Sequence, residues 1–163
     1  MEPDGGGPSA RLVIVCGLPG AGKTTLSKRL EADDDAVRMC PDEWMAELGI
    51  DLFDQTMRPL VEGLQWQVAE RLLGLGVSVV IEWGTWCRVE RDGLRERGRA
   101  LGAAVELRFL DATIDELWRR VDARGMEAQL GGRRLTRDDI VSYAATFERP
   151  DDDELALYDA PLG

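Results

Sequence analysis

The sequence predicts an α/β domain in which two layers of helices cover a five-stranded, mainly parallel sheet. Short apolar, β-branched segments alternate with longer amphipathic segments along the chain, a pattern typical of parallel strands connected by helices. In addition, the glycine-rich stretch 17–24 follows the first apolar segment and precedes the first helical one. This strand, turn and helix come in the order that a phosphate-binding loop requires.

The predicted strands are 12–16, 36–39, 77–81, 104–110 and 155–158, and the predicted helices are 25–30, 43–48, 56–75, 88–101, 113–123 and 136–147. Helix 56–75 is expected to be amphipathic because Leu60, Leu64, Val68 and Leu72 recur at four-residue steps. Thr113 and Glu116 form a capping-box pattern at the start of helix 113–123. The glycine-broken segment 126–135 predicts a mobile connection.

The 163 residues fit one domain, which we expect to span 11–163 after a disordered tail at 1–10. The first ten residues are polar and rich in Gly and Pro, unlike a secretion signal. No apolar segment approaches the roughly 20 residues needed to cross a bilayer. These features predict a cytoplasmic protein that does not bind membranes.

The charge of the chain bears on its partners. Its 20 basic and 31 acidic residues give a net charge of −11, which disfavours nucleic acid and favours a neutral or cationic small substrate, although acidity alone is also typical of a soluble protein. The sequence has no histidine, which excludes Ser-His and Cys-His nucleophiles and histidine metal sites. The three cysteines, Cys16, Cys40 and Cys87, have no metal-like spacing and are interpreted as reduced thiols.

The stretch Gly17-Leu18-Pro19-Gly20-Ala21-Gly22-Lys23-Thr24 meets the pattern G-x-x-x-x-G-K-[ST] at every fixed position. Glycines let backbone N–H groups close around phosphates, and the following helix directs its positive end at the same anion. We expect Lys23 to contact the β- and γ-phosphates and Thr24 to ligate Mg²⁺. The sequence therefore predicts a site for a nucleoside triphosphate, ATP with Mg²⁺, made by Gly17, Leu18, Pro19, Gly20, Ala21, Gly22, Lys23, Thr24 and Thr25.

Three acidic residues follow predicted strands and should share the sheet edge with the phosphate loop. Asp42 is positioned to orient an acceptor hydroxyl and to take its proton, or alternatively to cap a helix. Glu82 ends the most hydrophobic strand, where a carboxylate holds magnesium or contacts substrate. Asp111 is interpreted as belonging to the start of the Thr113 helix and is left outside the site.

Arg120 and Arg124 are four residues apart and share one helix face. They are predicted to close over the triphosphate and to stabilise charge during transfer. The alternative is a solvated face paired with Glu116 or Glu127. Arg133 and Arg134 are further candidates for the same role if the segment that carries them forms the lid.

Aromatic residues gather near the same strand ends, namely Trp44, Trp83 and Trp86, and are expected either to line a substrate pocket or to pack in the core. Arg88 and Arg91 follow directly. Arg91 is predicted to reach substrate, against the alternative that both arginines belong to a solvated helix face. The predicted substrate contacts are therefore Asp42, Glu82, Trp83, Trp86 and Arg91.

From Arg11 to about Arg124 the chain resembles the small P-loop phosphotransferases, which have an AAA-type ATP-binding domain. This group contains the polynucleotide 5′-hydroxyl kinases, zeta-toxin-type kinases, chloramphenicol phosphotransferase, and the shikimate and gluconate kinases. The resemblance rests on the loop 17–24, Cys40-Pro41-Asp42-Glu43, the strand 77–82 and the stretch 117–124. It implies a P-loop NTPase fold, Asp42 as the base for the acceptor hydroxyl, and Arg120 and Arg124 as lid residues over ATP.

The leading functional hypothesis is an ATP-dependent kinase that transfers the γ-phosphoryl group to a hydroxyl of a small molecule, such as a sugar-like metabolite or an antibiotic. A polynucleotide 5′-hydroxyl kinase is the first alternative, although the basic strip expected of it is missing. The second is a nucleotide-hydrolysing switch or assembly ATPase with no acceptor. The identity of the acceptor and the oligomeric state do not follow from the sequence.

Overall fold

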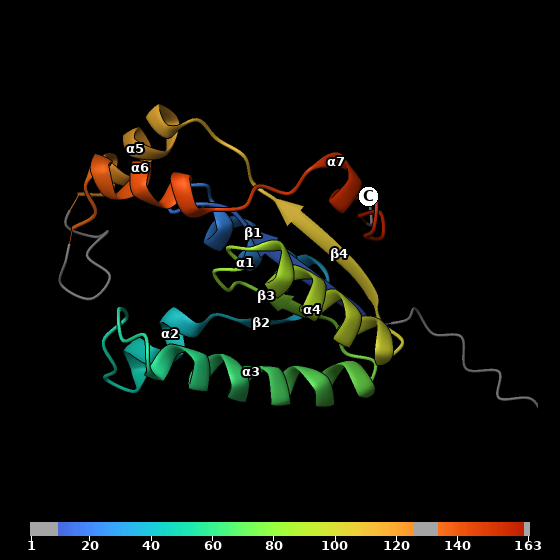
Figure 1. Ribbon diagram of the computed structural model, residues 1–163. Helices are drawn as coiled ribbons and strands as arrows, with labels where there is room; N and C mark the ends of the chain where they lie inside the picture. Colours follow the sequence, from blue (N-terminus) through green and yellow to red (C-terminus); the bar gives the residue numbers. More distant parts are fainter. Residues whose placement is uncertain (1–9, 126–133, 162–163) are drawn as a thin grey trace, which may run out of the picture.

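The computed structural model describes residues 10–125 and 134–161 (Figure 1). Within them, four strands form one parallel sheet in the order β2-β3-β1-β4. The strands are β1 (Arg11–Cys16), β2 (Val37–Met39), β3 (Val79–Ile81) and β4 (Ala104–Phe109). The helices are α1 (Lys23–Asp33), α2 (Pro41–Glu47), α3 (Met57–Gly74), α4 (Arg88–Ala100), α5 (Ile114–Ala123), α6 (Arg137–Thr146) and α7 (Asp152–Leu155).

The predicted α/β class and parallel sheet are confirmed, but the predicted fifth strand at 155–158 is wrong. Leu155 is the last residue of helix α7, which begins after Asp151, whose side chain accepts a hydrogen bond from the Glu154 N–H. An aspartate in this capping position favours a helical turn. The outer edge of β4 is instead met by Asp159, which bonds both the N–H and the carbonyl of Val105 at 2.7 and 2.8 Å.

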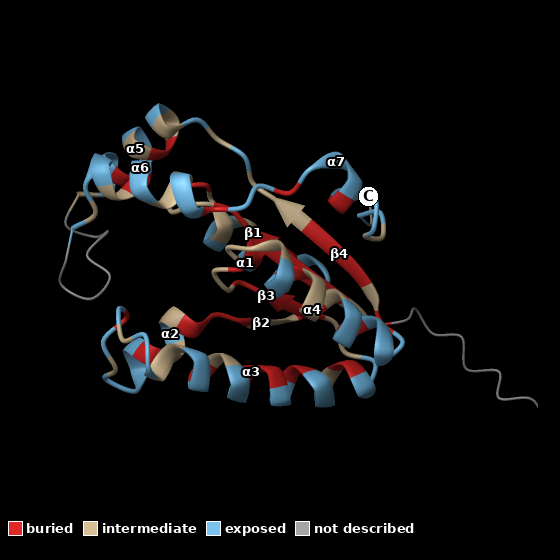
Figure 2. Cartoon of the chain, in the orientation of Figure 1, coloured by how far each residue is buried: buried red, intermediate tan, exposed pale blue. Residues whose placement is uncertain are grey.

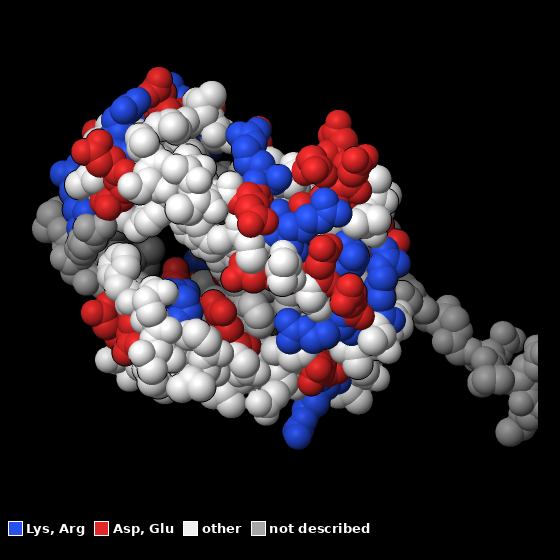
Figure 3. All heavy atoms as spheres, viewed as in Figure 1, with Lys and Arg blue, Asp and Glu red and all other residues white. Residues whose placement is uncertain are grey.

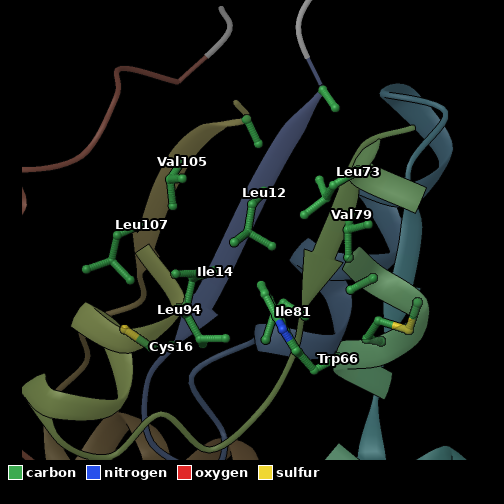
Figure 4. Close-up of a cluster of buried hydrophobic side chains, with 14 of the residues drawn as sticks. Leu12, Ile14, Cys16, Trp66, Leu73, Val79, Ile81, Leu94, Val105 and Leu107 are labelled. Carbon is green, nitrogen blue, oxygen red and sulfur yellow. The ribbon is translucent and has the colours of Figure 1, made fainter. Parts of the chain in front are cut away.

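The strand β1 packs on both of its faces (Figure 2). Leu12, Ile14 and Cys16 belong to the large hydrophobic cluster, together with residues of α3 and α4, as Figure 4 shows. The alternate residues Val13 and Val15 pack with Leu30 of α1 and with other residues on the opposite face. Burial on both faces explains why the strand is apolar without interruption.

Helix α3 is confirmed, but its predicted apolar face is not the buried one. Leu60, Leu64 and Val68 are exposed, whereas Leu72 of the predicted face is half-buried and packs against the large hydrophobic cluster. The buried face consists of Val61, Gln65, Trp66, Ala69 and Leu73. This face includes one polar residue, Gln65, which accepts a hydrogen bond from the Trp83 indole, so apolar spacing alone does not locate it.

The structure describes only part of the predicted tail at 1–10 and of the predicted connection at 126–135. Ala10, which was assigned to the tail, is buried, and its carbonyl accepts a bond from Ala104 N–H at 3.0 Å. Residues 1–9, and most of the predicted connection 126–135 including Arg133, lie outside the described residues. In the stretches 10–125 and 134–161, no helix combines the length and apolarity needed to cross a bilayer.

The parallel register aligns the carboxyl ends of the strands. Ile14 pairs with Ile81, Cys16 with Phe109, and Met39 with Ile81. The residues that follow the strands, Gly17, Cys40, Glu82 and Leu110, are therefore brought to one edge. This is the edge at which open α/β sheets bind ligands.

Candidate active site

The turn after β1 has the backbone of a phosphate loop. Gly17 and Gly20 have φ of 150° and 86°, and a Cβ on them would lie 2.7 Å from the Leu110 carbonyl oxygen and 2.9 Å from the Leu117 carbonyl oxygen. Gly22 has φ of 98°, and a Cβ there would meet no atom within 4 Å. At Gly17 and Gly20 a side chain would therefore collide with the backbone. At Gly22 a side chain has room, but the left-handed backbone favours glycine. These three glycines make up the glycine cradle, the part of the turn that the sequence predicts to hold phosphates.

Lys23 is the first residue of α1 and lies over the loop. Its ammonium donates hydrogen bonds to the carbonyls of Gly17 and Leu18, at 2.8 and 3.2 Å. Burial lowers the pKa of Lys23, whereas the carboxylates of Glu82 and Asp42 act in the opposite direction and the charge of Arg124 lowers it further. Three of the predicted site residues, two carboxylates and one guanidinium, therefore act on the pKa of Lys23.

Thr24 and Glu82 form the predicted magnesium pair. The Thr24 hydroxyl donates to Glu82 Oε1 at 2.5 Å, and Glu82 itself is buried. Magnesium at nucleotide sites is typically held by one or two protein oxygens together with water and phosphate oxygens. A hydroxyl and a carboxylate side by side therefore fit this ion.

The other oxygen of Glu82 is bound by Arg38, a residue that the sequence analysis did not select. Arg38 Nη1 donates to Glu82 Oε2 at 2.7 Å, and Nη2 donates to both oxygens of Glu43 at 2.6 Å. Burial alone would lower the pKa of Arg38, but these bonds outweigh it and raise the pKa. The signal in the sequence was an arginine within a short predicted strand, a position that needs a partner when it is buried.

Asp42 lies in the first turn of α2 but does not cap it. The N-cap residue is Cys40, and the helix start has no side-chain cap bond. The Asp42 carboxylate instead accepts a bond of 2.6 Å from Arg58 Nη2, which also donates to the Leu52 carbonyl at 2.7 Å. The helix-capping alternative is therefore wrong. Arg58 was missed because nothing in the sequence separates it from other surface arginines.

Arg120 and Arg124 flank the loop on its outer side. Arg120 Nη1 lies 3.4 Å from the Gly20 carbonyl. Both arginines line a cavity of about 370 Å³ that also reaches Gly22 and Thr25 at the start of α1. The two arginines thus lie beside the glycine cradle. Arg134 is exposed and pairs with Asp122 at 2.5 Å.

The two tryptophans of the segment 82–87 contact residues of the protein interior. Trp83 is half-buried and donates its indole N–H to Gln65 Oε1 at 2.9 Å. Trp86 meets Tyr143 edge to face, with ring centroids 5.2 Å apart. Trp44, Trp83 and Trp86 all pack against the large hydrophobic cluster.

Arg91, a predicted substrate contact, has no exposed surface. Its guanidinium donates to both oxygens of Glu154, at 2.6 and 2.9 Å, and to the Thr85 carbonyl at 3.0 Å. These bonds hold the Arg91 guanidinium against α7 and the segment 82–87. Arg88 bonds through its backbone N–H to Glu148 at 2.8 Å.

On the molecular surface, the face in Figure 3 is hollowed between the part that contains α5 and α6 and the part that contains α2 and α3. Acidic and basic side chains line this hollow.

A family model described as an AAA domain matches residues 12–150 of the chain. A comparison with curated protein sequences found no match. Among solved structures, a chain of the Pnkp1/Rnl/Hen1 RNA repair complex superposes with a TM-score of 0.71 at 17% identity, covering 98% of this chain and 49% of that one. The protein thus spans about half the length of that chain.

Two further structures are kinases. A sugar kinase from Janibacter sp. HTCC2649 has a TM-score of 0.60 at 25% identity, covering 89% of this chain and 82% of that one. The APS kinase of Mycobacterium tuberculosis, solved with AMPPNP and APS, has a TM-score of 0.62 at 21% identity, with coverages of 90% and 86%. The predicted resemblance to small P-loop kinases is confirmed at the level of the fold.

Proposed function

The chain belongs to the AAA domain family, and on this premise we propose that it transfers the γ-phosphoryl group of Mg-ATP to a hydroxyl of a small molecule. A fold shared with P-loop kinases supports phosphotransfer. The observation that carries the proposal is that Thr24, the residue after Lys23 in the glycine loop, donates a hydrogen bond to Glu82 Oε1 at 2.5 Å. In this proposal a phosphate cradle, a proton acceptor and a metal-holding acid would be combined at one sheet edge.

Each side chain has a role in this proposal. ATP would supply the phosphoryl group, and Mg²⁺ would neutralise its negative charge. The Lys23 ammonium would donate its hydrogen bonds to phosphate oxygens in place of the Gly17 and Leu18 carbonyls. Thr24 and Glu82 would hold the metal. Arg120 and Arg124 would stabilise the charge on the transferred group from the outer side of the loop.

Asp42 would act on the acceptor. Its carboxylate is held by Arg58 yet remains 40% exposed, so that one oxygen can meet a hydroxyl. Asp42 would take the hydroxyl proton as the acceptor oxygen bonds to phosphorus and the bond from phosphorus to ADP breaks. We place Trp83 at the acceptor side, and we assign Trp86 and Arg91 to the packing of the 82–87 segment.

The net charge of −11 supports a small acceptor over a long polyanion. The test is a transfer assay with purified protein, γ-labelled ATP, and separate panels of neutral sugars, aminated compounds including antibiotics, and 5′-hydroxyl oligonucleotides. The expected result is label on a small hydroxyl compound. Label on oligonucleotides would replace the proposal by polynucleotide 5′-kinase activity. Mg-dependent ATP loss with no labelled acceptor would replace it by a switch ATPase.

A further inference from the structure

Arg38 connects three elements at the candidate site. It lies in β2, and its guanidinium reaches Glu82 after β3, Glu43 in α2 and Glu31 in α1, at 2.7, 2.6 and 3.4 Å. The side chains of Arg38 and Glu82 are each only 6% exposed, whereas those of Glu31 and Glu43 are 42% and 51% exposed. The contact between Arg38 and Glu82 is therefore the buried part of this cluster.

The geometry of Glu82 shows what this contact does. One carboxylate oxygen accepts from Thr24 and the other from Arg38, so both oxygens are fixed from opposite sides. The backbone N–H of Glu82 is also fixed, because it donates to the Met39 carbonyl at 3.0 Å. A buried carboxylate held in this way keeps one orientation, as a metal-holding oxygen must.

The other edge of the guanidinium is bound to Glu43, the neighbour of Asp42 in α2. Both oxygens of Glu43 face Arg38 Nη2, and α2 begins two residues after β2 ends. The guanidinium is planar and rigid, so a displacement of Glu82 would be transmitted to the helix that carries Asp42. The acid beside the phosphate loop and the helix that carries Asp42 thus share one anchor, Arg38.

We propose that Arg38 is a positioning residue, which holds the Glu82 carboxylate against Thr24 for the metal and fixes the helix of Asp42 through Glu43. This inference rests on the proposed function, because it gives a role to Mg²⁺ at Thr24 and Glu82. A purely structural ion pair would stabilise the fold without altering how the site responds to Mg²⁺. The Mg²⁺ response therefore separates the two roles.

The test measures ADP binding by calorimetry across a Mg²⁺ titration, which needs no acceptor. Arg38→Lys keeps the positive charge but loses the planar guanidinium, whose two terminal nitrogens bind Glu82 and Glu43 at the same time. We expect the Mg²⁺ concentration for half-maximal tightening of ADP binding to rise by about ten- to hundredfold, the loss typical when the partner of a metal ligand is changed. ADP affinity without Mg²⁺ should stay within about twofold, because the loop itself is unchanged.

Two further variants sharpen the test. Arg11→Lys is the matched control, because Arg11 also pairs with a buried carboxylate, Glu106, but starts β1 at the opposite end of the sheet. It should leave the Mg²⁺ midpoint unchanged. Glu43→Gln leaves the bond between Arg38 and Glu82 in place, so the midpoint should shift by less than about threefold.

An unchanged Mg²⁺ midpoint in folded Arg38→Lys would overturn the inference while leaving the proposed function intact. An equal shift in Arg11→Lys would also overturn it, since the effect would then follow from general loosening. Failure of the unchanged protein to bind ADP at any Mg²⁺ concentration would overturn the proposed function itself. Circular dichroism and a thermal melt of each variant establish that it is folded.

Discussion

Arg58 Nη2 lies 2.6 Å from Asp42 Oδ1, and the same nitrogen is bound to the Leu52 carbonyl. The carboxylate is thus anchored by the first turn of α3 instead of capping its own helix. An anchored carboxylate loses less conformational entropy when it meets a substrate hydroxyl, which suits a residue that must act on one proton.

Asp42→Asn should bind ATP with nearly unchanged affinity and lose phosphoryl transfer by about 10²- to 10⁴-fold, the usual contribution of a general base. Asparagine keeps the size of the side chain and its bond to Arg58 but does not take the proton. Glu47→Gln, an exposed change in the same helix, is the control and should transfer at the normal rate. Transfer by Asp42→Asn at a normal rate would remove Asp42 from the role of base.

Lys23→Ala should weaken ATP binding by about ten- to hundredfold, because one charged hydrogen bond is worth about 1.5–3 kcal/mol. Turnover that depends on nucleotide should be lost with it. Lys28→Ala, in the same helix but exposed, should bind normally. Calorimetry with ATP measures both variants, and equal affinities in the two would show that Lys23 does not touch the phosphates.

Local patterns predicted the parts of the fold that depend on neighbouring residues. The Thr113 and Glu116 capping box is present at the start of α5, with both reciprocal bonds formed. The apolar strand around Ile14 is buried as predicted. The prediction of a fifth strand was wrong because Asp151 caps a helical turn and Asp159 bonds the edge of β4. The acidic run around Asp151 has neither a strand nor a helix period, so the sequence pattern did not indicate this.

The candidate site was predicted as far as its motif extends. Lys23 directly follows the last glycine of the loop in the sequence, so its location follows from the pattern. Arg38 and Arg58 were missed, because each acts through a residue distant in sequence, 44 positions away for Glu82 and 16 for Asp42. Arg91 was misjudged for a related reason, since its partner Glu154 lies 63 positions further along the chain.

Breaking the pair of Arg91 and Glu154 should be costly. Glu154→Gln leaves a buried arginine without its counter-charge, and the free energy of unfolding should fall by about 3–5 kcal/mol. Asp115→Asn, which breaks an exposed pair with Arg137, should change it by less than about 1 kcal/mol. Urea unfolding measures both, and similar small losses would mean that the buried pair contributes little to stability.

The two leucine environments of α3 give a matched comparison of burial. Leu73 is 4% exposed and Leu64 is 55% exposed on the same helix. Leu73→Ala should lower the free energy of unfolding by about 2–5 kcal/mol, as usual for a buried leucine. Leu64→Ala should change it by about 0.5 kcal/mol or less. The reverse order in a denaturant titration would contradict the helix orientation described above.

The buried thiols should make the fold sensitive to alkaline pH. Burial raises the pKa of Cys16 to about 12. Above about pH 8.5 the unfolded chain loses this proton while the folded protein retains it. Because the folded state then binds more protons, the free energy of unfolding falls with rising pH, by up to about 1.4 kcal/mol per unit.

Cys16→Ala should therefore lower stability at pH 7, through the loss of packed volume, and yet flatten the decline between pH 8.5 and 10.5 relative to the unchanged protein. Lysine and tyrosine titrations contribute equally to both proteins and cancel in the difference. Cys87→Ala, which alters a half-buried thiol at the start of α4, should leave the slope as it was. Urea unfolding at each pH gives the slopes, and parallel curves for Cys16→Ala and the unchanged protein would contradict the prediction.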